Sequence, residues 1–199
     1  MKSGRSGRGF LGSVRRVSQV LAWIAGGVIL FGSSVPISID VVSRLVLNRT
    51  LVASFEISGY ALAACIGLGM GYTVTTKANI RIDFLTARLP TPLRRLFDLI
   101  AAISLALVAA ALAWFSFGVL QQSWSMQAKS ISTLQVPLSV PQAIWWVGLF
   151  WFATVAVLVP ALAVVRYMRG DPEGFDALLS PSSLSEEIEQ TGVDDRSRR

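Results

Sequence analysis

Long apolar segments without charged side chains dominate the hydropathy pattern of this chain. Four of them are long enough to cross a bilayer, which takes about 20 apolar residues per helix. They cover residues 17–39, 57–76, 99–128 and 130–165. Because Pro137 and Pro141 interrupt the start of the last segment, its helix is expected to begin near residue 141. The pattern therefore predicts transmembrane helices near residues 17–43, 55–75, 92–124 and 141–168.

A different pattern occupies residues 77–95, between the second and third apolar segments. Ile82, Leu85 and Leu89 recur at helical spacing, and the arginines fall elsewhere. Such a segment is too polar to cross the bilayer and fits a short helix lying in the membrane surface, which ends at Pro90. The predicted fold is an all-α integral membrane protein with four transmembrane helices and a short horizontal amphipathic helix between helices 2 and 3.

The flanking segments divide the chain into three regions. Residues 1–16 form a basic cytoplasmic N-terminus, and residues 17–168 form the four-helix membrane domain. From residue 169 the composition changes to acids, serine and proline, which predicts a disordered cytoplasmic tail over residues 169–199. The first apolar segment is too long for a secretory signal core, so we expect an uncleaved helix there.

Basic residues are distributed unevenly among the connecting segments. The N-terminal segment and the connection between helices 2 and 3 hold five Lys or Arg residues each, whereas the first connection holds Arg44 and Arg49 and the third holds Lys129. Because basic connections stay in the cytoplasm, both termini are expected there. This topology and attraction to the lipid bilayer account for most of the basic excess, so no nucleic-acid partner is expected.

Composition removes most kinds of catalytic site. The chain has no histidine and a single cysteine, Cys65, which lies inside an apolar segment. An internal disulfide, a cysteine metal cluster, an imidazole zinc site and histidine ligation of haem are therefore excluded. The sequence contains no recognisable nucleophile with a base and an orienting group, and no phosphate-binding loop. We expect no cofactor, no metal site and no enzymatic activity.

Charged and small residues inside the helices are the candidate functional positions. Asp40 and Arg44 lie four residues apart near the end of the first helix, and Glu56 opens the second. Charges at membrane depth normally pair, so we expect an ion-paired network that locks two helices, with an ion-coupling carboxylate as the alternative. Gly67 and Gly71 in IGLGMGY let another helix approach closely, either within this chain or from a partner.

The order of these motifs resembles that of a known family, the small membrane (DctQ-type) subunit of tripartite ATP-independent periplasmic (TRAP) transporters. The resemblance covers roughly residues 14–170. It rests on DVVSR at residues 40–44, SFEISGY around Glu56, KANIRIDFLTARLP from Lys77, and TLQVPLSVPQAIWWVG at the entry to the last helix. Asn79 stands where the family often has histidine, and asparagine keeps its hydrogen bonding but cannot titrate.

The resemblance implies a small permease subunit with a scaffold role. The family's small subunit packs against a large multi-helix membrane subunit, a secondary transporter of the bacterial inner membrane. That subunit moves solute by sodium symport after a periplasmic solute-binding protein has docked transiently. By resemblance, the residues that matter for tethering helices or contacting the partner are Asp40, Arg44, Glu56, Asn79, Asp83 and Arg95. The alternative is a self-contained homo-oligomeric ion-coupled carrier that uses Glu56.

Overall fold

A computed structural model describes residues 4–49, 53–77, 89–132 and 135–179 of the chain. The elements are α1 (Gly4–Ile29), the π-helical turn η1 (Leu30–Ser34), α2 (Val35–Leu47), α3 (Ser54–Thr75), α5 (Thr91–Ser125), α6 (Ser139–Met168) and α7 (Pro172–Leu179). Four helical segments are long and apolar enough to cross a membrane, which confirms the predicted fold class. The horizontal helix expected after α3 falls largely on residues 78–88, which lie outside the described residues.

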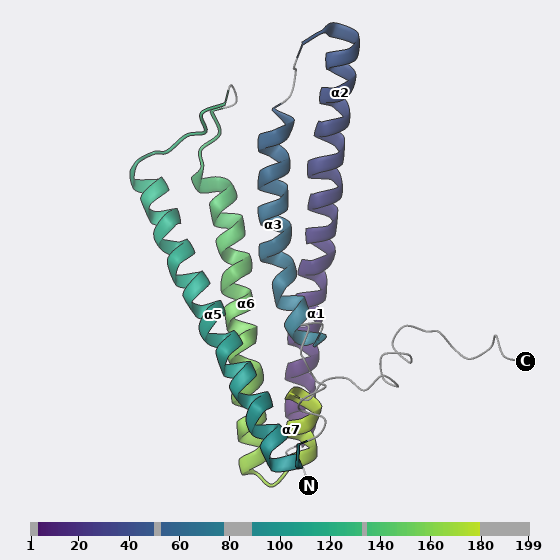
Figure 1. The fold of residues 1–199 in the computed structure, drawn as a ribbon, viewed down its shortest axis with the longest axis vertical. Coiled ribbons are helices and arrows are strands. Elements are labelled where there is room, and N and C mark those ends of the chain that lie inside the picture. The colour runs from purple at the N-terminus through teal and green to yellow at the C-terminus, as the bar shows by residue number, and fades with distance from the viewer. Residues whose placement is uncertain (1–3, 50–52, 78–88, 133–134, 180–199) are drawn as a thin grey trace, which may run out of the picture.

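The long helices stand side by side in the order α5, α6, α3 and α1–α2 (Figure 1). The N-terminus and α7 lie at one end of this layer, here called the terminal end. The α2–α3 and α5–α6 connections lie at the other, called the loop end. The helices at the two edges leave large apolar side chains exposed, among them Trp23 of α1 and Trp114 of α5. Such surfaces are suited to lipid or to a partner chain.

The first transmembrane helix is longer than the apolar pattern indicates. It begins at Gly4, before the predicted start at residue 17, and continues through α1, η1 and α2. The basic N-terminal segment joins the helix because its own periodicity places Val14 and Ser18 on one buried face. Ser18 Oγ accepts a hydrogen bond of 3.0 Å from Trp151 Nε1, which ties α1 to α6.

A wider turn interrupts this helix at η1, just before Pro36. Proline has no backbone N–H, so the carbonyl of Gly32, four residues earlier, lacks its usual donor, and a π-helical turn relieves the clash with the ring. Gly32 also lies against α3, because a Cβ at this position would come within 2.9 Å of the Ala61 Cβ. The turn therefore coincides with a close approach of the first helix to α3.

The centre of the layer is built from small and apolar residues on α3, α5 and α6. Its buried cluster, against which side chains of α3 pack, consists of Ala109, Leu149, Phe152, Ala153 and Ala156. Gly67 of α3 lies so close to α6 that an added Cβ would come within 2.9 Å of the Trp145 backbone oxygen. Gly148 of α6 faces Gly67 across the same contact, and a Cβ there would overlap the Gly67 backbone. Because lipid provides no hydrophobic drive between helices, close packing of this kind holds α3 to α6.

The chain beyond α6 is helical where the sequence predicts disorder. Pro172–Leu179 form α7, so the expectation of a disordered tail from residue 169 is wrong for this segment. Phe175 and Leu179, four residues apart, form a stripe that is buried against Ala102 of α5 and Ala163 of α6. Because the tail as a whole is polar, its average composition does not indicate this short amphipathic helix. Residues 180–199 lie outside the described residues.

An ion pair fastens α7 to the start of α5. Arg95 donates two parallel hydrogen bonds to the Asp176 carboxylate, from Nε at 2.8 Å and from Nη2 at 2.6 Å. This guanidinium holds the pKa of Asp176 below its usual value, although desolvation acts in the opposite direction. The turn into α7 runs through the left-handed Gly170 (φ 77°), and the Asp171 carboxylate accepts the Gly174 N–H at 2.8 Å. The tail is thus anchored by an apolar stripe, a cap and a charge pair.

Adding one methyl group at the α3–α6 contact should destabilise the fold. For Gly67→Ala we expect a loss of about 1–3 kcal/mol, the usual cost of overpacking, because the Trp145 backbone cannot move aside without shifting α6. Gly69→Ala, on the same helix, is the control, since a Cβ at Gly69 would meet no atom within 4 Å. Thermal unfolding in detergent, followed by fluorescence-detected size exclusion, measures both variants. Equal midpoints for the two would contradict the packing described for Gly67.

Acidification should weaken the attachment of α7. Because the pKa of Asp176 is lowered in the folded chain, its ion pair contributes stability above the unfolded pKa of about 3.9, and this contribution is lost as pH falls through the folded value. The pair is partly exposed, so we expect Asp176→Asn to cost about 1 kcal/mol at pH 7.

Below the folded pKa of Asp176, the Asp176→Asn variant and the unaltered chain should unfold at the same temperature. Hydrogen exchange of the α7 amides, measured beside thermal midpoints across the pH range, tests this. Glu173→Gln, an exposed position on the same helix, is the matched control. A difference between the Asp176→Asn variant and the unaltered chain that did not depend on pH would contradict the charge-pair explanation.

Candidate functional site

Asp40 joins the first and second transmembrane helices at the loop end. Its side chain is buried, with 5% of the residue exposed, and its Oδ2 accepts hydrogen bonds from Ser54 Oγ at 2.8 Å and from Arg44 Nη2 at 2.9 Å. Arg44 follows one turn later in α2, and Ser54 is the first residue of α3. A single carboxylate oxygen therefore holds the arginine of its own helix and the start of the next helix.

The Asp40 carboxylate depends on these two donors. Its other oxygen, Oδ1, is buried and has no hydrogen-bond partner among the described residues. The Arg44 side chain is 62% exposed, so its charge remains largely solvated while it reaches the buried oxygen. Leaving a buried acceptor unsatisfied costs about 1–3 kcal/mol. The α2–α3 junction is therefore sensitive to the loss of either donor.

Glu56 connects a different pair of elements from Asp40. It lies in the first turn of α3, and its Oε1 accepts a hydrogen bond from the Tyr60 hydroxyl, one turn further along. The hydroxyls of Ser130 and Ser132, in the connection between α5 and α6, interact with the Glu56 carboxylate. Its Oε2 is buried and has no hydrogen-bond partner among the described residues. Glu56 therefore ties the start of α3 to the α5–α6 connection, whereas the Asp40–Arg44 pair ties α2 to α3.

The α5–α6 connection has structure of its own that presents these serines. Lys129 and Pro137 form an isolated antiparallel bridge across it. The Ser132 N–H donates to Ser130 Oγ at 3.2 Å, and the Ser130 N–H donates to the Val136 carbonyl at 2.9 Å. These bonds fold the connection back on itself above α6, so that its hydroxyls face Glu56 rather than solvent alone.

The two glycines of IGLGMGY pack within the chain. Gly67 lies against the backbone of α6 at Trp145, and a Cβ on Gly71 would come within 2.6 Å of Trp151 Cδ1. Of the two readings that the sequence leaves open for these positions, the structure supports close approach of a helix from the same chain. Gly148 on α6 completes the contact.

Of three further sequence-derived candidates, the structure describes only Arg95. Asn79 and Asp83 lie outside the described residues. Arg95 lies in the first part of α5 and pairs with Asp176 of α7. The structure thus does not bring the described candidates to one place: Asp40, Arg44 and Glu56 act at the loop end, and Arg95 acts at the terminal end.

Several positions that tether elements escape sequence reasoning. Ser54 and Tyr60 are ordinary helix residues in the sequence, and Asp176 sits in a segment that looks disordered. Asp98 of α5 is also buried, and sequence reasoning does not single it out. Ser18 and Trp151 belong to helices that are far apart in sequence, so only the fold brings them together.

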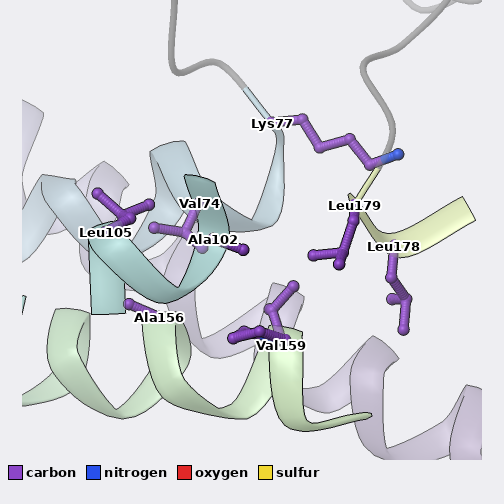
Figure 2. Close-up of a pocket in the computed structure, with 9 residues that line it drawn as sticks. Val74, Lys77, Ala102, Leu105, Ala156, Val159, Leu178 and Leu179 are labelled. Carbon is purple, nitrogen blue, oxygen red and sulfur yellow. The ribbon is translucent and has the colours of Figure 1, made fainter. Parts of the chain in front are cut away.

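The enclosed space near the terminal end is small. It lies between α3, α5, α6 and α7, and its cavity volume is about 30 Å³. Figure 2 shows its lining, with Val74 from α3, Lys77 just after α3, Ala102 from α5 and Val159 from α6, closed off by Leu179 of α7. This volume is comparable to that of one water molecule in the liquid. The cavity is therefore too small to hold an organic solute.

Comparison with known proteins identifies the family to which this chain belongs. The family described as "Tripartite ATP-independent periplasmic transporters, DctQ component" matches residues 33–167. The matched region takes in α2, α3, α5 and nearly all of α6, and with them Asp40, Arg44 and Glu56. Searches of curated proteins and of solved structures found no match. Together with four membrane-spanning helices, the match confirms the resemblance drawn from the motifs, and this multi-pass membrane chain belongs to the DctQ family of TRAP transporter components.

Proposed function

We propose that this chain is the small permease subunit that scaffolds and anchors the large transporting subunit of a TRAP transporter. The complex would take up solute by sodium symport, with a periplasmic binding protein as its third part. The main support is the position of the tethering charges, because Asp40, Glu56 and Arg95 each join two elements at an end of the layer. Charges in these places brace the helices against one another.

The exposed edges of the layer offer the surfaces that such a role needs. Trp23 and Phe31 project from the first helix, and Trp114 and Phe115 project from α5. Helices in lipid associate through close side-chain packing, so a larger membrane subunit can bind along either edge. Translocation then belongs to the large subunit, and this chain widens and steadies the immobile part of the complex.

The complex is proposed to lie in the bacterial inner membrane with the terminal end in the cytoplasm. This end holds Lys77, Arg94, Arg95, Arg166 and Arg169, against Arg44, Arg49 and Lys129 at the loop end. Segments rich in Lys and Arg stay in the cytoplasm, so the loop end faces the periplasm. That orientation places the α5–α6 connection on the side from which a binding protein would dock.

The alternative of a self-contained carrier with Glu56 as the coupling group has weaker support. Coupling carboxylates of carriers usually lie near the bilayer midplane, beside broken helices. Glu56 lies in the first turn of α3, where it engages Tyr60 and the serines of the α5–α6 connection. Its geometry suits a tether at the membrane surface.

Affinity purification tests the proposal directly. The chain, expressed with its native neighbours and purified in mild detergent, should bring down a larger multi-helix membrane protein in stoichiometric amount, as identified by mass spectrometry and sizing. A clean homo-oligomer that carries solute when reconstituted alone would overturn the proposal.

Removing a tether should reduce assembly rather than transport. For Arg44→Ala and Glu56→Ala we expect a lower yield of the complex with the large subunit, because the α2–α3 junction and the α5–α6 connection lose their donors or acceptor. Transport per assembled complex, measured after reconstitution, should stay unchanged. Glu173→Ala, which removes an exposed acid from α7, is the control for loss of charge. Normal assembly combined with a selective loss of sodium coupling in Glu56→Ala would contradict the tethering role.

A further inference from the structure

The end of α2 extends past the other helices at the loop end. Asp40 bonds to Ser54, which is the first residue of α3, so these two residues lie at the same level of the layer. The rest of α2, residues 41–47, continues beyond that level, and Figure 1 shows it rising above α3, α5 and α6. At 1.5 Å per residue, this segment is about 10 Å long. It is called the α2 prong below.

The α2 prong is apolar on several sides. Its exposed large side chains are those of Val41, Val42, Leu45, Val46 and Leu47. Leu45 is 80% exposed and Val46 is 74% exposed, so neither is covered by this chain. Ile39, Val42, Val46 and Leu47 form an open apolar surface along the same helix. Isolated apolar side chains are common on protein surfaces, but a contiguous projecting group marks a site of contact with protein or membrane.

Lipid is poorly placed to cover this segment. α3 has 22 residues and is therefore about 33 Å long, close to the roughly 30 Å thickness of the hydrocarbon core. Glu56 lies in the first turn of α3 and Lys77 follows its last turn, so a charged residue stands at each polar boundary of the bilayer. The α2 prong lies beyond the Glu56 end, at the level of lipid head groups and water rather than acyl chains.

The chemistry of the α2 prong favours a permanent protein partner. Obligate interfaces are more apolar than transient ones, and a surface covered only during docking would be exposed to water most of the time. Arg44 and Arg49 flank the apolar side chains, so the matching surface should be apolar with acidic groups at its rim. We propose that the α2 prong docks against such a surface on the large membrane subunit, an inference that depends on the proposed function.

Cysteine labelling in membranes tests this contact. In a Cys65→Ala background, Leu45→Cys is treated with a membrane-impermeant maleimide applied to the loop-end side, in the chain expressed alone and in the complex with the large subunit. The thiol should react in the chain alone and lose its reactivity in the complex. Gln127→Cys, at an exposed position beyond α5, is the positive control in the chain alone. Leu107→Cys, exposed in the middle of α5, should remain unreactive in both because acyl chains surround it.

The other results each overturn the inference. A thiol that is unreactive in the chain alone would mean that lipid or a second copy covers the α2 prong. A thiol that stays reactive in the complex, or that is protected only when the binding protein is added, would mean that no permanent partner sits there. Co-purification of the large subunit is scored on the same samples. Intact co-purification with an unprotected thiol refutes only the docking surface, whereas loss of co-purification with the unsubstituted chain refutes the proposed function.

Discussion

The close approach of α3 to α6 is the constraint on which the rest of the structure depends. Two helices in lipid gain nothing from hydrophobic burial, so they associate only where their surfaces allow many short contacts. Gly67 and Gly148 remove the side chains that would keep the backbones apart. α5 then packs on α6 and the first helix packs on α3, so the order of the layer follows from this central pair.

Charged groups near the helix ends add to the stabilisation that helix packing provides at the centre. Near the centre of the layer the contacts are between alanine, glycine, leucine and aromatic side chains, whereas Asp40, Glu56 and Arg95 act near the ends. This division follows from the bilayer, since an ion pair costs least near the interface, where one partner can remain hydrated. The partly exposed Arg44 beside the buried Asp40 illustrates it. Packing sets which helices are neighbours, and the charges set their register at each end.

The sequence predicts the helices well because span length and charge are local properties. The predicted second to fourth helices end within two residues of α3, α5 and α6. The hydropathy pattern does not predict the start of α1, because a basic segment gives no apolar signal, although Val14 and Ser18 lie on one helical face.

Contacts between distant segments are harder to predict from sequence. The sequence predicts that Gly67 allows a close helix contact but does not identify Gly148 as the partner. It also does not predict that Glu56 interacts with Ser130 and Ser132. The composition of the tail does not predict α7, because the two residues of its apolar stripe, Phe175 and Leu179, hardly change the average over residues 169–199.

The short length of α3 also ties the subunit to the thickness of its membrane. α3 has 22 residues, against 35 in α5 and 30 in α6, and its neighbours hold it upright in the middle of the layer. Longer helices absorb a thicker bilayer by tilting or by extending beyond it, but a short central helix cannot, and each ångström of hydrophobic mismatch costs a fraction of a kcal/mol. A thick bilayer would draw Glu56 toward hydrocarbon and disturb its interaction with the serines of the α5–α6 connection. The acyl-chain length of the surrounding lipid therefore acts on the loop end of this subunit through α3.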